Sequence, residues 1–266
     1  MKINDKKELK QEEIKKIALD VLIDVADFCD KNNIVYYLSC GTLLGAIRHH
    51  GFIPWDDDID IMMFRTDYNI FLSKYKSEKY KLLKPSAGMY YYAKVYDSNT
   101  IKIEPNIDYK KYDYLGIDVD IFPIDGIVND DKVINKMRTK TKILETLLRL
   151  SNQPIFYRKN PLKCVNRIIP RMIGSKRLVK MIENNCQKFN INDCDYVIRM
   201  RNSPNGFTGA QKKDVYYPPA KREFQGYMFN VPNDYDRWLS NFFGDYLTLP
   251  PEEKRKSHHN TKCYQK

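Results

Sequence analysis

The chain has 266 residues, of which 42% are hydrophobic, and a formal net charge of +11. This length allows one large domain or one and a half, and the hydrophobic fraction is sufficient for a packed core. The sequence contains neither a low-complexity stretch nor a run of about 18 apolar residues, so we expect no transmembrane helix. The first residues, MKINDKKELKQEE, lack the apolar region of a signal peptide, which favours a cytoplasmic protein.

The six cysteines are far apart in the sequence and form neither a CxxC pair nor a cluster with histidine. This spacing argues against a disulfide framework and against a zinc site, and it is typical of reduced thiols in a cytoplasm.

The positive charge is concentrated in one segment. Residues 138–180 contain twelve Lys or Arg and a single acid, Glu145, so the rest of the chain is neutral. A neutral body with one basic segment predicts that an anionic partner binds at that segment.

In chain order, the first predicted element is an amphipathic helix over residues 6–32, because apolar residues recur there at helical spacing. The β-branched and aromatic run IVYYLSC, residues 34–40, predicts a strand. Gly41 and Thr42 then turn the chain into a short helix, LLGAIRHH. The following GFIPWDD is expected to be a loop, since glycine and proline interrupt regular structure.

Two later strands place pairs of aspartates on one face. In DIDIMM, Asp58 and Asp60 share a face because side chains alternate along a strand. The run GIDVDIFPID, residues 116–125, repeats this alternation with Asp118 and Asp120.

The remaining pattern predicts an α+β fold with a largely helical C-terminal half. We expect a helix at 65–75, strands at 79–84, 89–97 and 100–104, helices at 130–150 and 160–190 with breaks at Pro170 and Gly174, and an irregular last seventy residues. These elements suggest a catalytic core over residues 1–128 and a helical or irregular region over residues 129–266 that packs on it.

The aspartate pairs predict a site for a hard cation. Two buried carboxylates a few ångströms apart repel each other, and the arrangement persists if a cation lies between them. Carboxylates without nearby His or Cys select Mg²⁺ or Mn²⁺. Asp118 or Asp120 would add the third carboxylate to Asp58 and Asp60. Because Mg²⁺ bound in this way keeps positions for phosphate oxygens, phosphoryl transfer is the expected use.

Other residues favour a phosphate ligand. A glycine turn between a strand and a helix presents backbone N–H groups and the Thr42 hydroxyl to a phosphate. Arg48 and Lys94 are candidates to neutralise the remaining phosphate charge. The twenty tyrosines could supply an aromatic cage for a quaternary ammonium group.

At these residues the sequence resembles the LicD family, which are bacterial phosphocholine transferases of the nucleotidyltransferase superfamily. The run SCGTLLGAIRHHGFIPWDDDIDIMM matches the family's long signature, and AKVYDSNT, GIDVDIFPID and FGDYLTLPPEEKRKSHH match later blocks in order. The resemblance implies a nucleotidyltransferase-like mixed sheet. It places the metal carboxylates at Asp58, Asp60 and Asp120, and the nucleotide-phosphate turn at Gly41 and Thr42.

The resemblance also implies the reaction and its partners. We expect transfer of phosphocholine from CDP-choline to a sugar hydroxyl of a lipid-linked glycan, such as a teichoic acid precursor, with release of CMP. Asp120 is the expected acceptor of the hydroxyl proton. The residues expected to contact substrate are Trp55, Tyr91 and Tyr114 at the trimethylammonium group, and His258 and His259 in the tail motif, for which a structural role is equally open.

The basic segment suits an acceptor held at a membrane. Apolar residues over 162–173 alternate with Lys163, Arg167 and Arg171 at steps of four, a pattern that fits either an anionic inner leaflet or an ordinary core-packing helix with a solvated basic face. The expected location is therefore the cytoplasm, with peripheral contact to the membrane.

Three alternatives remain open from the sequence. The donor could be another CDP-alcohol, with ribitol, glycerol or ethanolamine in place of choline. An RNA-directed nucleotidyltransferase is disfavoured, because the sequence shows no RNA-binding motif and its positive charge lies in one segment; we expect no nucleic-acid partner. An inactive scaffold is disfavoured by the presence of all three aspartates.

Overall fold

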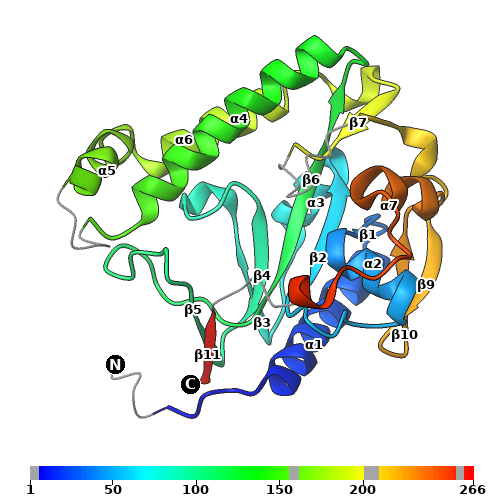
Figure 1. The fold of residues 1–266 in the computed structure, drawn as a ribbon, viewed down its shortest axis with the longest axis horizontal. Coiled ribbons are helices and arrows are strands. Elements are labelled where there is room, and N and C mark those ends of the chain that lie inside the picture. Colours follow the sequence, from blue (N-terminus) through cyan, green and yellow to red (C-terminus); the bar gives the residue numbers. More distant parts are fainter. Residues whose placement is uncertain (1–5, 156–161, 201–209, 256–260) are drawn as a thin grey trace.

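A computed structural model describes residues 6–155, 162–200, 210–255 and 261–266. Among these residues, seven strands form one mixed sheet, which lies at the centre of the molecule and is surrounded by helices (Figure 1). This mixed arrangement is consistent with the α+β prediction.

The central part of the sheet has the order β1-β2-β6-β4-β3. Strand β1 (Tyr37–Leu38) is antiparallel to β2 (Asp60–Phe64), and β2 is parallel to β6 (Asp118–Ile127). On its other side, β6 pairs antiparallel with β4 (Ala93–Asp97), and β4 pairs antiparallel with the edge strand β3 (Tyr80–Leu83). Every residue of β2 and β6 is buried, so the aspartates at their beginnings enter the interior of the protein.

The far end of β6 extends the sheet in a second direction. There β6 pairs with β7 (Tyr196–Ile198), which pairs with β8 (Gln211–Lys212), both antiparallel. The ten-residue strand β6 therefore has different neighbours at its two ends.

Helices from the first half of the chain pack against the central strands. Helix α1 (Gln11–Lys31) contacts β4 and β6, and α3 (Arg65–Lys74) contacts β2 and β6. The buried face of α1 follows the predicted helical period, with Ala18, Val21, Leu22, Val25, Ala26 and Cys29. The predicted N-terminal helix is thus confirmed with shorter ends. Helix α2 (Cys40–His49) lies between β1 and β2 in sequence.

Three further helices form a layer with its own hydrophobic cluster. Helix α4 (Asp131–Asn152) lies along α6 (Ser175–Cys186), and α5 (Leu162–Ile173) lies at one end of this pair (Figure 1). The predicted break is confirmed at Gly174, which has a φ of 87°, whereas Pro170 lies inside α5. The cluster is formed by Ile127, Ile134, Met137, Leu144, Leu148, Leu178, Val179, Ile182, Cys186, Ile198 and Met200.

The last seventy residues are more regular than predicted. Strands β9 (Ala220–Phe224) and β10 (Tyr227–Val231) form a hairpin, and helix α7 (Tyr235–Phe243) follows. The hairpin turn is Gln225-Gly226, both with positive φ, a conformation that favours glycine. Strand β11 (Lys262–Gln265) pairs with β5 (Thr100–Ile103), a contact that local pattern cannot reveal.

A largely helical C-terminal half is therefore not confirmed, because this half also contains β7 to β11. Its later part also rejoins the first core: Val215, Phe224 and Trp238 belong to the same hydrophobic cluster as α1 and the central strands. Short 3₁₀ turns complete the described elements at Pro85–Ala87, Ile191–Asp193, Lys213–Val215 and Glu252–Lys254. No helix within the described ranges has the length and apolar character needed to cross a bilayer.

Candidate functional site

Asp60 and Asp120 lie opposite each other on neighbouring parallel strands. Asp60 begins β2 and is the register partner of Asp120 in β6. The Asp120 N–H donates a hydrogen bond of 2.9 Å to the Ile59 carbonyl, which extends the ladder by one residue. Neighbouring strands are about 4.8 Å apart, and register partners on parallel strands point to the same face. The two buried carboxylates therefore lie side by side.

Asp58 is not part of the strand, contrary to the predicted alternation, because β2 begins only at Asp60. It lines a cavity of about 10 Å³ together with Asp57, Asp118 and Lys102. A cavity of this size holds about one water molecule. In the described part of the chain, no three or more His, Cys, Asp or Glu side chains form a group that could hold a metal ion by themselves.

Two lysines compensate the carboxylates of β6. The Lys94 ammonium contacts Asp118 Oδ2 at 2.9 Å and Asp120 Oδ1 at 2.5 Å. The Lys102 ammonium contacts the other oxygen of Asp118, Oδ1, at 2.7 Å. Lys94 comes from β4 and Lys102 from β5, so two different strands supply the cations.

This arrangement gives the two aspartates different pKa values. Burial alone would raise the pKa of Asp118, but the Lys102 and Lys94 ammonium groups outweigh burial and hold its pKa below the usual range. Burial, together with the neighbouring Asp118 charge, outweighs the Lys94 ammonium at Asp120 and raises its pKa. The two carboxylates hold the pKa of Lys94 well above its usual value against the effect of burial. Asp120 is consequently the more basic carboxylate of the two.

Lys94 thus contacts protein carboxylates, whereas the sequence suggested a contact with phosphate. Its ammonium also lies over the rings of Tyr90 and Tyr92, at 4.7 and 5.6 Å from their centroids. Sequence reasoning missed Lys102 and both of these tyrosines. A lysine inside the short apolar strand β5 was a usable signal, because a buried lysine requires an acidic partner.

The α2 N-terminus differs from the predicted glycine turn. Helix α2 already begins at Cys40, so Gly41 and Thr42 belong to its first turn. The Thr42 hydroxyl accepts a hydrogen bond of 2.9 Å from the Asp60 N–H and thereby fixes the start of β2. A Cβ on Gly41 would lie 2.1 Å from Asp56 Oδ2, so a side chain at this position would force Asp56 to move.

Arg48 connects α2 to the C-terminal segment. Its guanidinium donates hydrogen bonds to the backbone carbonyls of Tyr246, at 2.7 Å, and of Thr248, at 3.4 Å. In this arrangement Arg48 orients residues 245–248 against α2.

The three predicted aromatic residues have different surroundings. The Trp55 ring lies 6.3 Å from the His49 ring, and the Arg255 guanidinium lies 5.8 Å from the Trp55 centroid. Tyr114 stacks on Tyr109 with centroids 4.2 Å apart. His258 and His259 lie outside the described residues.

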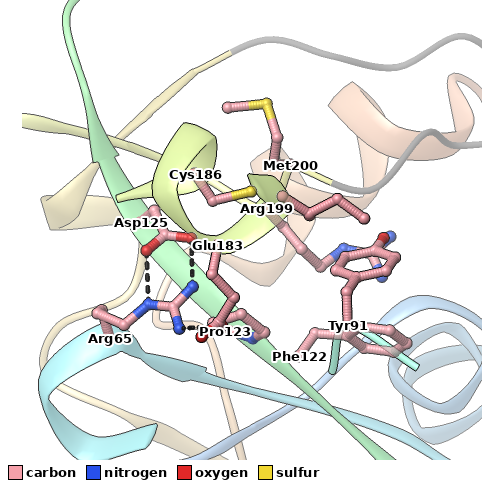
Figure 2. A pocket seen from close by; sticks show the side chains of 10 residues that line it. Arg65, Tyr91, Phe122, Pro123, Asp125, Glu183, Cys186, Arg199 and Met200 are labelled. Atoms are coloured by element: carbon pink, nitrogen blue, oxygen red, sulfur yellow. Dashed lines mark hydrogen bonds and ion pairs between the residues drawn. The ribbon is translucent and has the colours of Figure 1, made fainter. Parts of the chain in front are cut away.

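Tyr91 lines a small pocket beside β6 (Figure 2). In this pocket the Arg65 guanidinium contacts both oxygens of Asp125, at 2.6 and 2.8 Å, and Glu183 at 3.1 Å. This buried ion pair connects α3, β6 and α6. The Arg199 guanidinium lies 5.0 Å from the ring centroid of Phe122, which follows Asp120 by two residues and so shares its face of β6.

Comparison with known proteins shows the family of this chain. Residues 33–155 match the family described as "LicD/FKTN/FKRP, nucleotidyltransferase domain". The chain is 32% identical over 271 residues to "Lipopolysaccharide cholinephosphotransferase LicD" of Haemophilus influenzae, and the match covers 97% of this chain and 99% of that protein. A shorter match, 42% identical over 62 residues, covers 22% of this chain and 20% of an uncharacterized protein of Rickettsia typhi. An uncharacterized protein of Rickettsia prowazekii is 52% identical over 44 residues, which is 16% of each chain.

The similarity to a cholinephosphotransferase over 97% of this chain indicates an enzyme of the phosphotransferase class. More particularly, the chain belongs to the LicD family.

Proposed function

We propose that this enzyme transfers phosphocholine from CDP-choline to a sugar hydroxyl of a cell-surface glycan precursor, a teichoic acid or a similar polymer, and releases CMP. The full-length similarity to a lipopolysaccharide cholinephosphotransferase supports the choline cargo and a glycan acceptor. The observation that supports the chemistry is the register pairing of Asp60 with Asp120 inside a buried sheet. We further propose a lipid-linked acceptor, which would place the enzyme at the inner face of the cell membrane.

The carboxylates fit a divalent cation that the donor helps to hold. Mg²⁺ is usually bound by one or two protein carboxylates together with water and substrate phosphates, so a complete three-residue cage is not required. Asp60 and Asp120 would supply the two neighbouring oxygens, and Asp58 a third ligand from the preceding loop. The Lys94 contact uses Oδ1 of Asp120, so Oδ2 would be the oxygen that binds the cation. Mg²⁺, or Mn²⁺, would neutralise charge on the diphosphate during transfer.

The protein residues would position the reactants and move one proton. The acceptor oxygen forms a bond to the phosphorus atom that bears choline, and the bond from this phosphorus to CMP breaks in line with it. Asp120 would accept the hydroxyl proton, a role that its raised pKa supports. Lys94 would hold the Asp120 side chain in place through the ion pair. Backbone N–H groups in the first turn of α2, at Gly41 and Thr42, would bind donor phosphate.

The remaining substrate contacts are proposed on the basis of the sequence. Trp55, Tyr91 and Tyr114 are proposed to contact the trimethylammonium group through their ring faces. Arg48 would act on the donor indirectly, by holding residues 245–248 against α2. His258 and His259 are proposed substrate contacts in the tail.

The test is an assay of CMP release from CDP-choline with and without Mg²⁺ and a lipid-linked oligosaccharide. CDP-ribitol, CDP-glycerol and CDP-ethanolamine serve as competing donors. Asp60→Asn and Asp120→Asn are expected to abolish metal-dependent release, whereas Asp27→Asn, at an exposed aspartate of α1, keeps it. Preference for another donor would replace the choline assignment, and near-normal activity of Asp60→Asn would refute the carboxylate assignment.

A further inference from the structure

Helix α5 has its arginines on the inner side. Arg167 is only 5% exposed, and its guanidinium bonds the Gln153 side chain at 3.3 Å and the Ile155 carbonyl at 2.8 Å. Arg171 contacts Asp108 Oδ2 at 2.8 Å and the Gln153 carbonyl at 2.6 Å. These two arginines therefore attach α5 to the body of the protein. The predicted arrangement, in which Arg167 and Arg171 face an anionic surface, is wrong, because Asp108 and backbone carbonyls from distant segments bind them.

The outer side of α5 is apolar instead. Ile168, Ile169 and Met172 are 50%, 65% and 81% exposed. Met172 follows Ile168 by four residues and Ile169 by three, so the three side chains are neighbours on the helix and form one continuous apolar surface. Adjacent exposed apolar side chains of this kind mark an interaction site rather than ordinary surface.

The charge around this surface identifies the partner. The neighbouring helices present exposed bases to solvent: Lys140, Lys142 and Arg149 on α4, and Lys176, Arg177 and Lys180 on α6. Glu145 is the single acid between residues 138 and 180. An apolar strip flanked by bases matches the boundary between anionic headgroups and acyl chains of a lipid leaflet. A second copy of the chain is a poorer occupant, because its own basic segment would be repelled.

We propose that Ile168, Ile169 and Met172 of α5 insert into an anionic membrane surface, and that the bases of α4 and α6 contact the lipid headgroups. Figure 1 shows α5 at the end of the α4–α6 layer, at the edge of the molecule and away from the central sheet. The inference depends on exposure and charge alone, so it holds whichever donor the enzyme uses. It adds a docking surface for the membrane in which a lipid-linked acceptor resides.

The experiment compares sedimentation of the full chain with phosphatidylcholine vesicles and with vesicles that also contain phosphatidylserine. The variant is Ile169→Asp with Met172→Asp, and the matched control is Met228→Asp, at a residue of β10 that is 58% exposed. We expect the wild type and the control to bind the anionic vesicles, and the double variant to bind them at least about tenfold more weakly. Binding to the neutral vesicles is expected to be weaker for all three proteins.

A second readout separates docking from folding and from catalysis. CMP release from CDP-choline, with water in place of the glycan as the acceptor of phosphocholine, is expected to be the same for the double variant and the wild type, because neither residue lies among the site residues. Unchanged binding of the double variant to anionic vesicles overturns the proposal. So does light scattering that shows a wild-type dimer and a monomeric double variant, because a second copy would then cover α5. If the wild type releases no CMP from CDP-choline even with the lipid-linked oligosaccharide, the proposed function is contradicted. The vesicle-binding result then still stands by itself.

Discussion

Replacement of Lys94 by methionine tests the electrostatic design of the site. The substitution keeps a long apolar side chain and removes the ammonium that contacts Asp118 and Asp120, all three of which are buried. Removing one partner of a buried ion pair costs about 3–5 kcal/mol. Asp118 keeps its contact with Lys102, so we expect the lower end, about 3 kcal/mol. For a chain of this size that loss corresponds to a fall in Tm of roughly 6–12 °C.

Mg²⁺ provides the second half of the test. If Asp60 and Asp120 hold a divalent cation, Mg²⁺ replaces the missing positive charge in Lys94→Met. At a concentration one hundred times its Kd, a ligand stabilises the folded state by about 2.7 kcal/mol. Urea unfolding followed by circular dichroism, with and without Mg²⁺, measures this gain. The matched control is Lys102→Met, which removes a lysine that contacts Asp118 and leaves the Lys94–Asp120 pair in place.

Two results would refute this reasoning. A loss of less than about 1 kcal/mol in Lys94→Met would mean that the lysine does not compensate the carboxylates. Equal stabilisation by Mg²⁺ of Lys94→Met and of the double variant Lys94→Met with Asp60→Asn would mean that the cation binds elsewhere.

Three further predictions concern other contacts of the structure. Gly41→Ala is expected to lower stability by about 1–3 kcal/mol, because the added Cβ meets Asp56, and Asp56→Ala in the same chain should recover most of this loss in a double-mutant cycle. Arg65→Met should cost about 3–5 kcal/mol, measured by urea unfolding, because it leaves the buried Asp125 carboxylate without its two hydrogen bonds. Burial would raise the pKa of Asp108, but the Arg171 guanidinium outweighs burial and lowers it. The contribution of this ion pair to the free energy of unfolding is therefore present above about pH 4, and it is lost as the pH falls through the lowered pKa. The difference in unfolding free energy between wild type and Asp108→Asn should accordingly shrink below pH 4, and a constant difference would contradict the assignment.

The elements that the sequence predicted well are those in which one pattern extends over a whole segment. The apolar period of residues 6–32 corresponds to α1, and the alternation in GIDVDIFPID corresponds to β6. The aspartate pair could also be anticipated, because strands with acidic residues at their beginnings need a compensating charge. That Asp60 and Asp120 are exact register partners required the pairing of β2 with β6, which no single segment encodes.

The features that the sequence could not supply depend on contacts between distant segments. Lys102 and Asp118 are sixteen residues apart, and their ion pair forms where Lys102 of β5 bridges to Leu115, three residues before Asp118. The orientation of α5 depends on Asp108, whose carboxylate binds Arg171 from outside the helix. From the helical spacing alone, the basic side of α5 was expected to face outward. The β9–β10 hairpin was missed because its Gln225-Gly226 turn is surrounded by proline- and tyrosine-rich sequence.

The length of β6 has a consequence for how the chain unfolds. Val119 and Ile121 belong to the hydrophobic cluster of the central sheet, and Ile127 of the same strand belongs to the cluster of α4 and α6. One continuous backbone segment therefore forms part of two cores, and the Arg65–Asp125 pair joins them at the same place. Unfolding of either core would expose the side of β6 that packs in the other core. Calorimetry should therefore record a single melting transition in which both cores unfold.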